Sequence, residues 1–183
     1  MATKLKSIAV YCGHQAGIDP QFKRDARAVG RMLAKNNIRM VFGGGDVGLM
    51  GTVASAALDN GGDVIGVSTD DVIAMQEPAH DGISVQVVDG VYERKQIMFN
   101  ESDAFIILPG GIGTLNELTD IMTMQQIGET DKPLFLLNTN GFWNPLTRLI
   151  KHMRKNGFIV KTDNYNIFSA ETVAELKKQI LKY

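Results

Sequence analysis

The sequence predicts an α/β fold: a single-domain, doubly wound, Rossmann-like parallel sheet with helices on both faces. Short apolar runs alternate with longer segments of helical periodicity along nearly the whole chain, which is typical of βαβ units. Two of the passages from an apolar run into a helix are rich in glycine. The 183 residues, 44% of them apolar, suffice for one core. Since no repeat, linker or low-complexity segment divides the chain, we expect one domain over residues 1–183.

The apolar runs give the predicted strands in chain order, because they are bounded by turn residues and are rich in β-branched or aromatic side chains. The strands are expected at Ser7–Cys12, Ile38–Phe42, Asp63–Ser68, Ser84–Val88, Ala104–Leu108 and Pro133–Leu137, with a short last strand at Asn166–Phe168. The segments between them have apolar residues at helical spacing. Helices are expected at Gln21–Asn36, Thr52–Asn60, Val91–Ser102, Phe142–Asn156 and Glu171–Lys182. A further helix is expected to follow the glycine-rich stretch after Leu108 and to end at about Ile127. The acidic segment Thr69–Gly82 is expected to be irregular.

Composition excludes several classes of protein. Nineteen Lys and Arg against twenty Asp and Glu give a net charge of −1, which argues against nucleic acid as the main partner. The single cysteine, Cys12, excludes an intrachain disulfide and a multi-cysteine metal cluster. No run approaches the roughly 20 apolar residues that span a bilayer, so no membrane partner is expected. The N-terminal apolar run is too short for a secretion signal, and we expect a cytoplasmic protein.

The two glycine-rich turns, Gly43–Gly48 and Pro109–Thr114, follow predicted strands and precede predicted helices. Ligands of such sheets bind beyond the carboxyl ends of the strands, and a helix N-terminus offers unpaired N–H groups to an anion. One such turn is explained equally well by tight-turn geometry. Two turns at equivalent strand ends favour a ligand that carries phosphate. From these turns we expect contacts from Gly44, Gly45 and Gly110.

The first turn also fits the dinucleotide pattern G-x-G-x-x-G through Gly43, Gly45 and Gly48. An NAD-dependent oxidoreductase is therefore an alternative, with Asp70 or Asp71 as a late candidate for the ribose contact. The pattern is weak, because it follows the second strand rather than the first and does not explain the second turn. A phosphate loop of the Walker type is excluded, since neither turn ends in Gly-Lys-Ser/Thr.

Glu117 follows Thr114 by three residues, which is the spacing of a helix-capping box. Thr172 and Glu175 have the same spacing without surrounding glycines, so the pattern alone does not decide between a cap and a functional carboxylate. Glu117, Asp120 and Thr123 (or Met124) recur at helical spacing and share one side of the helix. A carboxylate one turn from a bound phosphate would lie near the sugar of a nucleotide, where it could stabilise positive charge at the anomeric carbon.

Arg94 and Lys95 are adjacent cations near the start of a predicted helix. Cations there oppose the helix dipole, and a solvated charged surface is the simpler interpretation. The planar fork of Arg94 would suit a phosphate or ribose contact.

Three stretches resemble the LOG (LONELY GUY) family of cytokinin riboside 5′-monophosphate phosphoribohydrolases, long labelled as possible lysine decarboxylases. They are Gly43–Gly51, the Arg94-Lys95 pair with Met98, and Pro109–Glu117, which has the family pattern P-G-G-x-G-T-x-x-E intact. The likeness runs to about Val160. It implies a homodimer without a cofactor or metal that hydrolyses the N-glycosidic bond of adenosine-type nucleoside 5′-monophosphates. Nothing in the chain identifies a Schiff-base lysine for a decarboxylase.

The resemblance also implies roles for individual residues. Arg94 and Glu117 would be the catalytic pair, and Gly111, Gly113 and Thr114 would hold the phosphate. The remaining substrate contacts that it implies are Glu77, Lys95, Met98 and Thr123.

The chain departs from the family pattern beside the first strand. Gly13-His14-Gln15 stands where the family usually has Gly-Ser-Ser, and Asn116 replaces a common acidic residue next to Glu117. The bulkier side chains could change which base or phosphate fits. They also leave open a second class of function, a nucleotide-binding sensor or carrier without catalytic activity.

Overall fold

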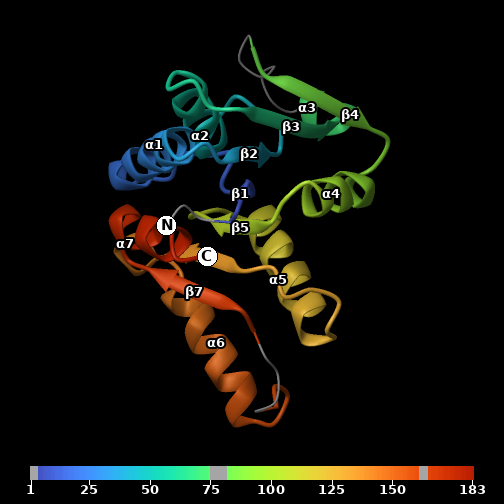
Figure 1. The fold of residues 1–183 in the computed structure, drawn as a ribbon. Helices are drawn as coiled ribbons and strands as arrows, with labels where there is room; N and C mark the ends of the chain where they lie inside the picture. The colour runs from blue at the N-terminus through green and yellow to red at the C-terminus, as the bar shows by residue number, and fades with distance from the viewer. Residues whose placement is uncertain (1–3, 75–81, 161–164) are drawn as a thin grey trace.

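Seven parallel strands form one sheet in the order β4-β3-β2-β1-β5-β6-β7 (Figure 1). The computed structural model describes residues 4–74, 82–160 and 165–183. The strands are β1 (Ser7–Tyr11), β2 (Arg39–Phe42), β3 (Val64–Thr69), β4 (Ser84–Val88), β5 (Ala104–Ile107), β6 (Leu134–Leu137) and β7 (Ile167–Ala170). Every residue of β5 and β6 is buried, as expected for strands covered on both faces. The predicted α/β fold with a doubly wound parallel sheet is confirmed.

Helices cover both faces of this sheet (Figure 1). They are α1 (Pro20–Lys35), α2 (Gly48–Leu58), α3 (Asp70–Ala74), α4 (Val91–Asn100), α5 (Ile112–Gln126), α6 (Asn144–Lys155) and α7 (Val173–Ile180), with a 3₁₀ turn η1 at Thr139–Gly141. One apolar cluster joins the sheet to α1, α2 and α7. A second cluster joins the other face to α4, α5 and the start of α6. Within the described ranges, no helix is both long and apolar enough to cross a membrane.

The direction of winding reverses between β1 and β5. From β1 the chain adds β2, β3 and β4 on one side, and it then returns to place β5 against the other side of β1. Ligands of doubly wound sheets bind at such a switch point, beyond the carboxyl ends of the strands. The two glycine-rich turns follow β2 and β5, the two neighbours of β1, so both lie at this edge.

Two differences from the predicted elements have physical causes. Helix α2 begins at Gly48 rather than Thr52, because the carbonyl oxygen of Gly13 accepts hydrogen bonds from Leu49 N (3.0 Å) and Met50 N (3.3 Å). A contact so distant in sequence was not visible in local propensity. Only the start of the segment predicted to be irregular differs: Asp70–Ala74 form the short helix α3, where Thr69 Oγ1 accepts a hydrogen bond from Val72 N at 3.3 Å. Residues 75–81 of that segment lie outside the described residues.

Candidate active site at the carboxyl edge of the sheet

The second glycine-rich turn presents an open helix N-terminus. Gly111 is the N-cap of α5 and makes no side-chain capping bond, so the first N–H groups of the helix have no side-chain acceptor there. Gly111, Ile112 and Gly113 are exposed. A Cβ atom at Gly111 or Gly113 would meet nothing within 4 Å. Because the fold does not require glycine at these two positions, open access to the N–H groups is the simplest reason for it.

Thr114 does not act as the helix cap that its spacing from Glu117 suggested. It lies inside α5, two residues after the first helical residue, and is buried with its hydroxyl beside Gly110. The matching pair near the C-terminus does form a cap: Thr172 Oγ1 accepts from Glu175 N at 3.2 Å, and Glu175 Oε2 accepts from Glu171 N at 2.9 Å. The capping interpretation therefore holds for Glu175, whereas Glu117 is not used in a cap.

The first glycine-rich turn is closed by the protein itself. Gly43, Gly44 and Gly45 are buried, and the N–H of Gly45 faces the Met50 sulfur at 3.4 Å. A Cβ at Gly43 would overlap the guanidinium of Arg94, and Gly44 has a φ of +80°. Packing and backbone geometry thus account for glycine in this turn. Contacts of Gly44 and Gly45 with substrate stay a prediction.

Arg94 is buried and is held by backbone oxygens from two strand ends. Its Nε donates to the carbonyl of Val67 in β3 at 2.8 Å, and its Nη2 donates to the carbonyl of Gly43 at 3.3 Å. Among the described residues it forms no ion pair with a carboxylate. The solvated-surface interpretation is therefore wrong for Arg94, whose charge is fixed at the carboxyl edge of the sheet.

The loop after β1 ties the two turns together. Gly13 N donates to the carbonyl of Pro109 at 3.0 Å, and Gly13 O accepts from Leu49 N. The exposed His14 lines a cavity of about 180 Å³ together with Gly110 and Gly111. The departure from the family pattern therefore lies directly beside the second turn.

The pKa of Glu117 is shifted toward neutral pH by this arrangement. Burial raises its pKa to about 7, against opposing effects of the Arg94 and Lys95 charges, while Asp120 raises it further. Burial, and secondarily the charge of Glu117, also raises the pKa of the Tyr11 hydroxyl at the end of β1. Glu117 is thus a carboxyl group poised to exchange protons near neutral pH, which is typical of functional sites.

Glu117 lines a hollow of about 460 Å³ between α4 and α5, in which apolar surface predominates. The lining residues are Tyr11, Tyr92, Lys95, Gln96, Phe99, Asn100, Glu117, Asp120, Ile121, Thr123 and Met124. Two further residues of the predicted site, Lys95 and Thr123, are therefore brought to Glu117. The volume is in the range of small-molecule sites, which are mostly apolar with a few polar groups.

Two other residues singled out from the sequence, Met98 and Cys12, lie in the core. Met98 is fully buried in the apolar cluster of α4 and α5, so its place in the structure is in the core. Cys12 is buried, and burial raises the pKa of its thiol, which makes it an inert core residue. Glu77 lies outside the described residues.

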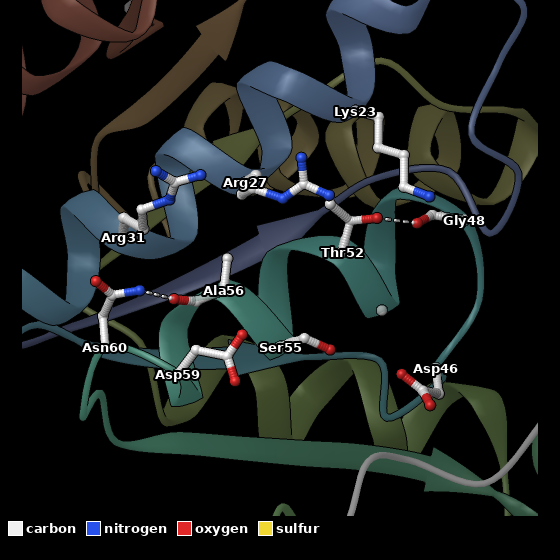
Figure 2. Close-up of a pocket in the computed structure, with 11 residues that line it drawn as sticks. Lys23, Arg27, Arg31, Asp46, Gly48, Thr52, Ser55, Ala56, Asp59 and Asn60 are labelled. Carbon is white, nitrogen blue, oxygen red and sulfur yellow. Dashed lines mark hydrogen bonds between the residues drawn. The ribbon is translucent and has the colours of Figure 1, made fainter.

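A separate groove of about 550 Å³ runs between α1 and α2 (Figure 2). Lys23, Arg27 and Arg31, one turn apart on α1, face Thr52 and Ser55 of α2 across it. All three cations are exposed, as in a solvated charged surface. None of the residues predicted for the active site lines this groove. In the described parts of the chain, no group of three or more His, Cys, Asp or Glu side chains is placed to hold a metal ion.

The sequence-based site omitted Tyr11, Tyr92 and Asp120, which line the hollow beside Glu117. A signal for Asp120 was present, since it follows Glu117 by three residues and shares its side of α5. Tyr11 is the last residue of a buried strand that ends at the ligand edge. Its position there depends on the strand order, which the sequence did not specify.

Comparison with known proteins identifies the family. A family model described as "Possible lysine decarboxylase" matches residues 50–180. The chain is 43% identical over 155 residues to a cytokinin riboside 5′-monophosphate phosphoribohydrolase of Rhodococcoides fascians, covering 84% of this chain and 78% of the relative. It is 39% identical over 181 residues to the phosphoribohydrolase LOG1 of Arabidopsis thaliana, covering 99% and 85%. The chain belongs to the LOG family.

Solved structures show the fold of the LOG family in more distant proteins. The molybdenum cofactor carrier protein of Chlamydomonas reinhardtii superposes with a TM-score of 0.72 at 20% identity, over 97% of this chain and 98% of the carrier. At this identity the likeness extends to the fold alone. Because one fold can support different functions, the function of this LOG family member depends on its site.

Proposed function

We propose that this chain hydrolyses the N-glycosidic bond of adenosine-type nucleoside 5′-monophosphates, giving the free base and ribose 5-phosphate. The observation that carries the proposal is the convergence of Arg94 and Glu117 beside an open helix N-terminus at the switch point of the sheet. Curated relatives that share 36–43% identity over most of the chain are named phosphoribohydrolases of this kind. The intact motif Pro109–Glu117 supports the proposal, because it supplies both the open helix N-terminus and Glu117.

The exposed N–H groups at the start of α5 would bind the 5′-phosphate, helped by the positive end of the helix dipole. Glu117 lies one turn further along α5, where the ribose would follow the phosphate. In its ionised form it would orient the attacking water and stabilise the positive charge that develops at the anomeric carbon. Arg94 is already fixed by two carbonyl oxygens and supplies a charge that needs little reorganisation when the substrate binds.

The hollow between α4 and α5 would receive the base. Tyr11, Tyr92 and Phe99 give it aromatic surface, which suits a planar purine. Its apolar character also suits an apolar substituent on the exocyclic N6 of adenine. Cytokinin-like nucleotides are therefore proposed substrates alongside AMP.

The test is a chromatographic assay for free base with AMP, N6-isopentenyl AMP and the two matching nucleosides. Base should be released from the monophosphates and not from the nucleosides. Replacing the carboxylate in Glu117→Gln should lower kcat at least about 100-fold and leave nucleotide binding largely intact. Glu175→Gln makes the same change in the same Thr-x-x-Glu pattern at an ordinary helix cap and serves as the matched control.

Full activity of Glu117→Gln would refute the assigned role. Binding of AMP without release of base from any substrate would favour the alternative, a nucleotide-binding sensor or carrier, and would direct attention to His14.

We also propose that the protein forms a homodimer and works in the cytoplasm. The likeness to the LOG family implies the dimer, and apolar surface is available for it: Leu149 and Met153 of α6 are 48% and 39% exposed. The single buried cysteine, Cys12, fits a reducing compartment. Light scattering over a range of protein concentrations measures the mass of the particle. A monomer at every concentration would contradict the proposed dimer and would leave the proposed activity unaffected.

A further inference from the structure

Lys95 forms an ion pair with a second carboxylate on α5, that of Asp120. Its Nζ lies 2.5 Å from Asp120 Oδ2 and 3.1 Å from Asn116 Oδ1. The same ammonium lies 5.1 Å from the ring centroid of Tyr92. The side chain of Lys95 is 18% exposed and that of Asp120 is 43% exposed. The ammonium is therefore bound on three sides at the rim of the hollow that Glu117 lines.

This pair matters because charges of both signs act on Glu117. Arg94 and Lys95 of α4 favour the ionised carboxylate, and Asp120 of α5 disfavours it. Tyr11, at the end of β1, lines the same hollow as Glu117, and burial keeps its hydroxyl and the neighbouring Cys12 thiol neutral. The Arg94 guanidinium is fixed by backbone carbonyls. Lys95 is the cation whose position depends on a titratable partner.

We propose that Asp120 is a positioning residue for the glycosidase reaction: it holds the Lys95 ammonium at the rim of the hollow and prevents it from pairing with Glu117. The carboxylate of Glu117 is thereby kept for the substrate and the attacking water. This inference rests on the proposed function. Asn116 supports the arrangement, because its side-chain oxygen is a second hydrogen-bond acceptor for the Lys95 ammonium. Since this side chain is neutral, it adds no further negative charge beside Glu117.

Removing the charge of Asp120 has two effects of the same sign. The repulsion between Asp120 and Glu117 is lost, and Lys95 is released to approach Glu117. Both effects stabilise the ionised form of Glu117, so its pKa should fall by about one unit in Asp120→Asn. Removing the cation in Lys95→Met should raise that pKa. In the double variant the two changes oppose each other, and the pKa should return close to the wild-type value.

The direct measurement is an NMR titration of ¹³C-labelled glutamate carboxyls in the free protein, with Glu117→Gln to assign the signal. Starting from a pKa of about 7, a downward shift of one unit raises the ionised share of Glu117 at pH 6 about fivefold. The kinetic counterpart is the pH profile of kcat/KM for AMP. In Asp120→Asn its lower limb should move to lower pH by the same amount, and the plateau should fall because Lys95 competes for Glu117.

The matched control is Asp63→Asn, which removes the carboxylate of the Arg39–Asp63 ion pair (2.6 Å) at the other end of the strands and should leave the Glu117 signal unchanged. A lower plateau or a less stable Asp120→Asn protein without a shifted Glu117 titration would show a merely structural role and overturn the proposal. The titration needs no turnover. A shifted titration in a protein that releases no base would therefore refute the proposed function and, with it, the role of Asp120 in that reaction, while the electrostatic effect of Asp120 and Lys95 on Glu117 would still hold.

Discussion

Gly113→Ala separates ligand binding from folding at the second glycine-rich turn. Gly113 is the second residue of α5, and a Cβ there would meet nothing within 4 Å. Alanine favours a helix over glycine by about 1 kcal/mol, so the variant should be more stable than the wild type by about 0.5–1 kcal/mol. The added methyl group nevertheless occupies the space through which a phosphate would approach the N–H groups.

The expected loss of affinity follows from those hydrogen bonds. A bond from an N–H group to a charged acceptor contributes about 1.5–3 kcal/mol. Losing one of them should raise the dissociation constant for AMP about 10- to 100-fold, since 1.4 kcal/mol corresponds to a factor of ten. Calorimetry in a Glu117→Gln background measures binding without turnover, and urea unfolding measures stability.

Gly90→Ala is the control, because the added methyl group also meets nothing within 4 Å and φ at this position is −151°. Its affinity for AMP should match that of the wild type. Unchanged affinity in Gly113→Ala would refute the assignment of phosphate to this turn. A loss of affinity together with a loss of stability would show that the fold, rather than a ligand, requires glycine there.

Two further predictions concern Arg94 and Glu117. Gly43→Ala should displace the Arg94 guanidinium and lower kcat about 10- to 100-fold. The substitution should also lower the free energy of unfolding, and this cost should largely vanish in an Arg94→Ala background, where the overlap is removed. An equal cost in both backgrounds would contradict this prediction. Because the pKa of Glu117 is raised from 4.5 to about 7, the folded protein holds a proton that the unfolded chain releases. Its stability should therefore fall by about 3 kcal/mol as pH rises from 4.5 to 7 and then level off. Urea unfolding at pH 5 and pH 8 should show this fall in the wild type and not in Glu117→Gln.

The fold could be predicted because its strands can be recognised from the local sequence. Strands such as β5 and β6 are buried at every position, so they appear in the sequence as short continuous apolar runs, and the helices between them show their own period. The order of the strands was not predicted. It depends on pairings such as Ile8 with Ala104, almost a hundred residues apart.

The candidate site was only partly predictable, as the two Thr-x-x-Glu patterns show. Thr172 caps α7, whereas Thr114 lies within α5 because the helix already begins at Ile112. The Thr-x-x-Glu spacing alone does not distinguish the two, since it is the same in both, and the difference lies in where each helix begins. Arg94 gives a second example. The sequence suggested an exposed cation, but its partners are carbonyl oxygens 27 and 51 residues away.

The two glycine-rich turns look alike in the sequence and have different reasons for their glycines. In the first turn a side chain at Gly43 would expel Arg94, so its glycines serve the protein's own packing. In the second turn Gly111 and Gly113 leave space that no part of the described chain fills. The first turn thus fixes the Arg94 guanidinium before any substrate binds. The second turn leaves backbone N–H groups accessible to a substrate. One rigid half and one open half would suit the proposed reaction, in which charge develops between the bound phosphate and the base.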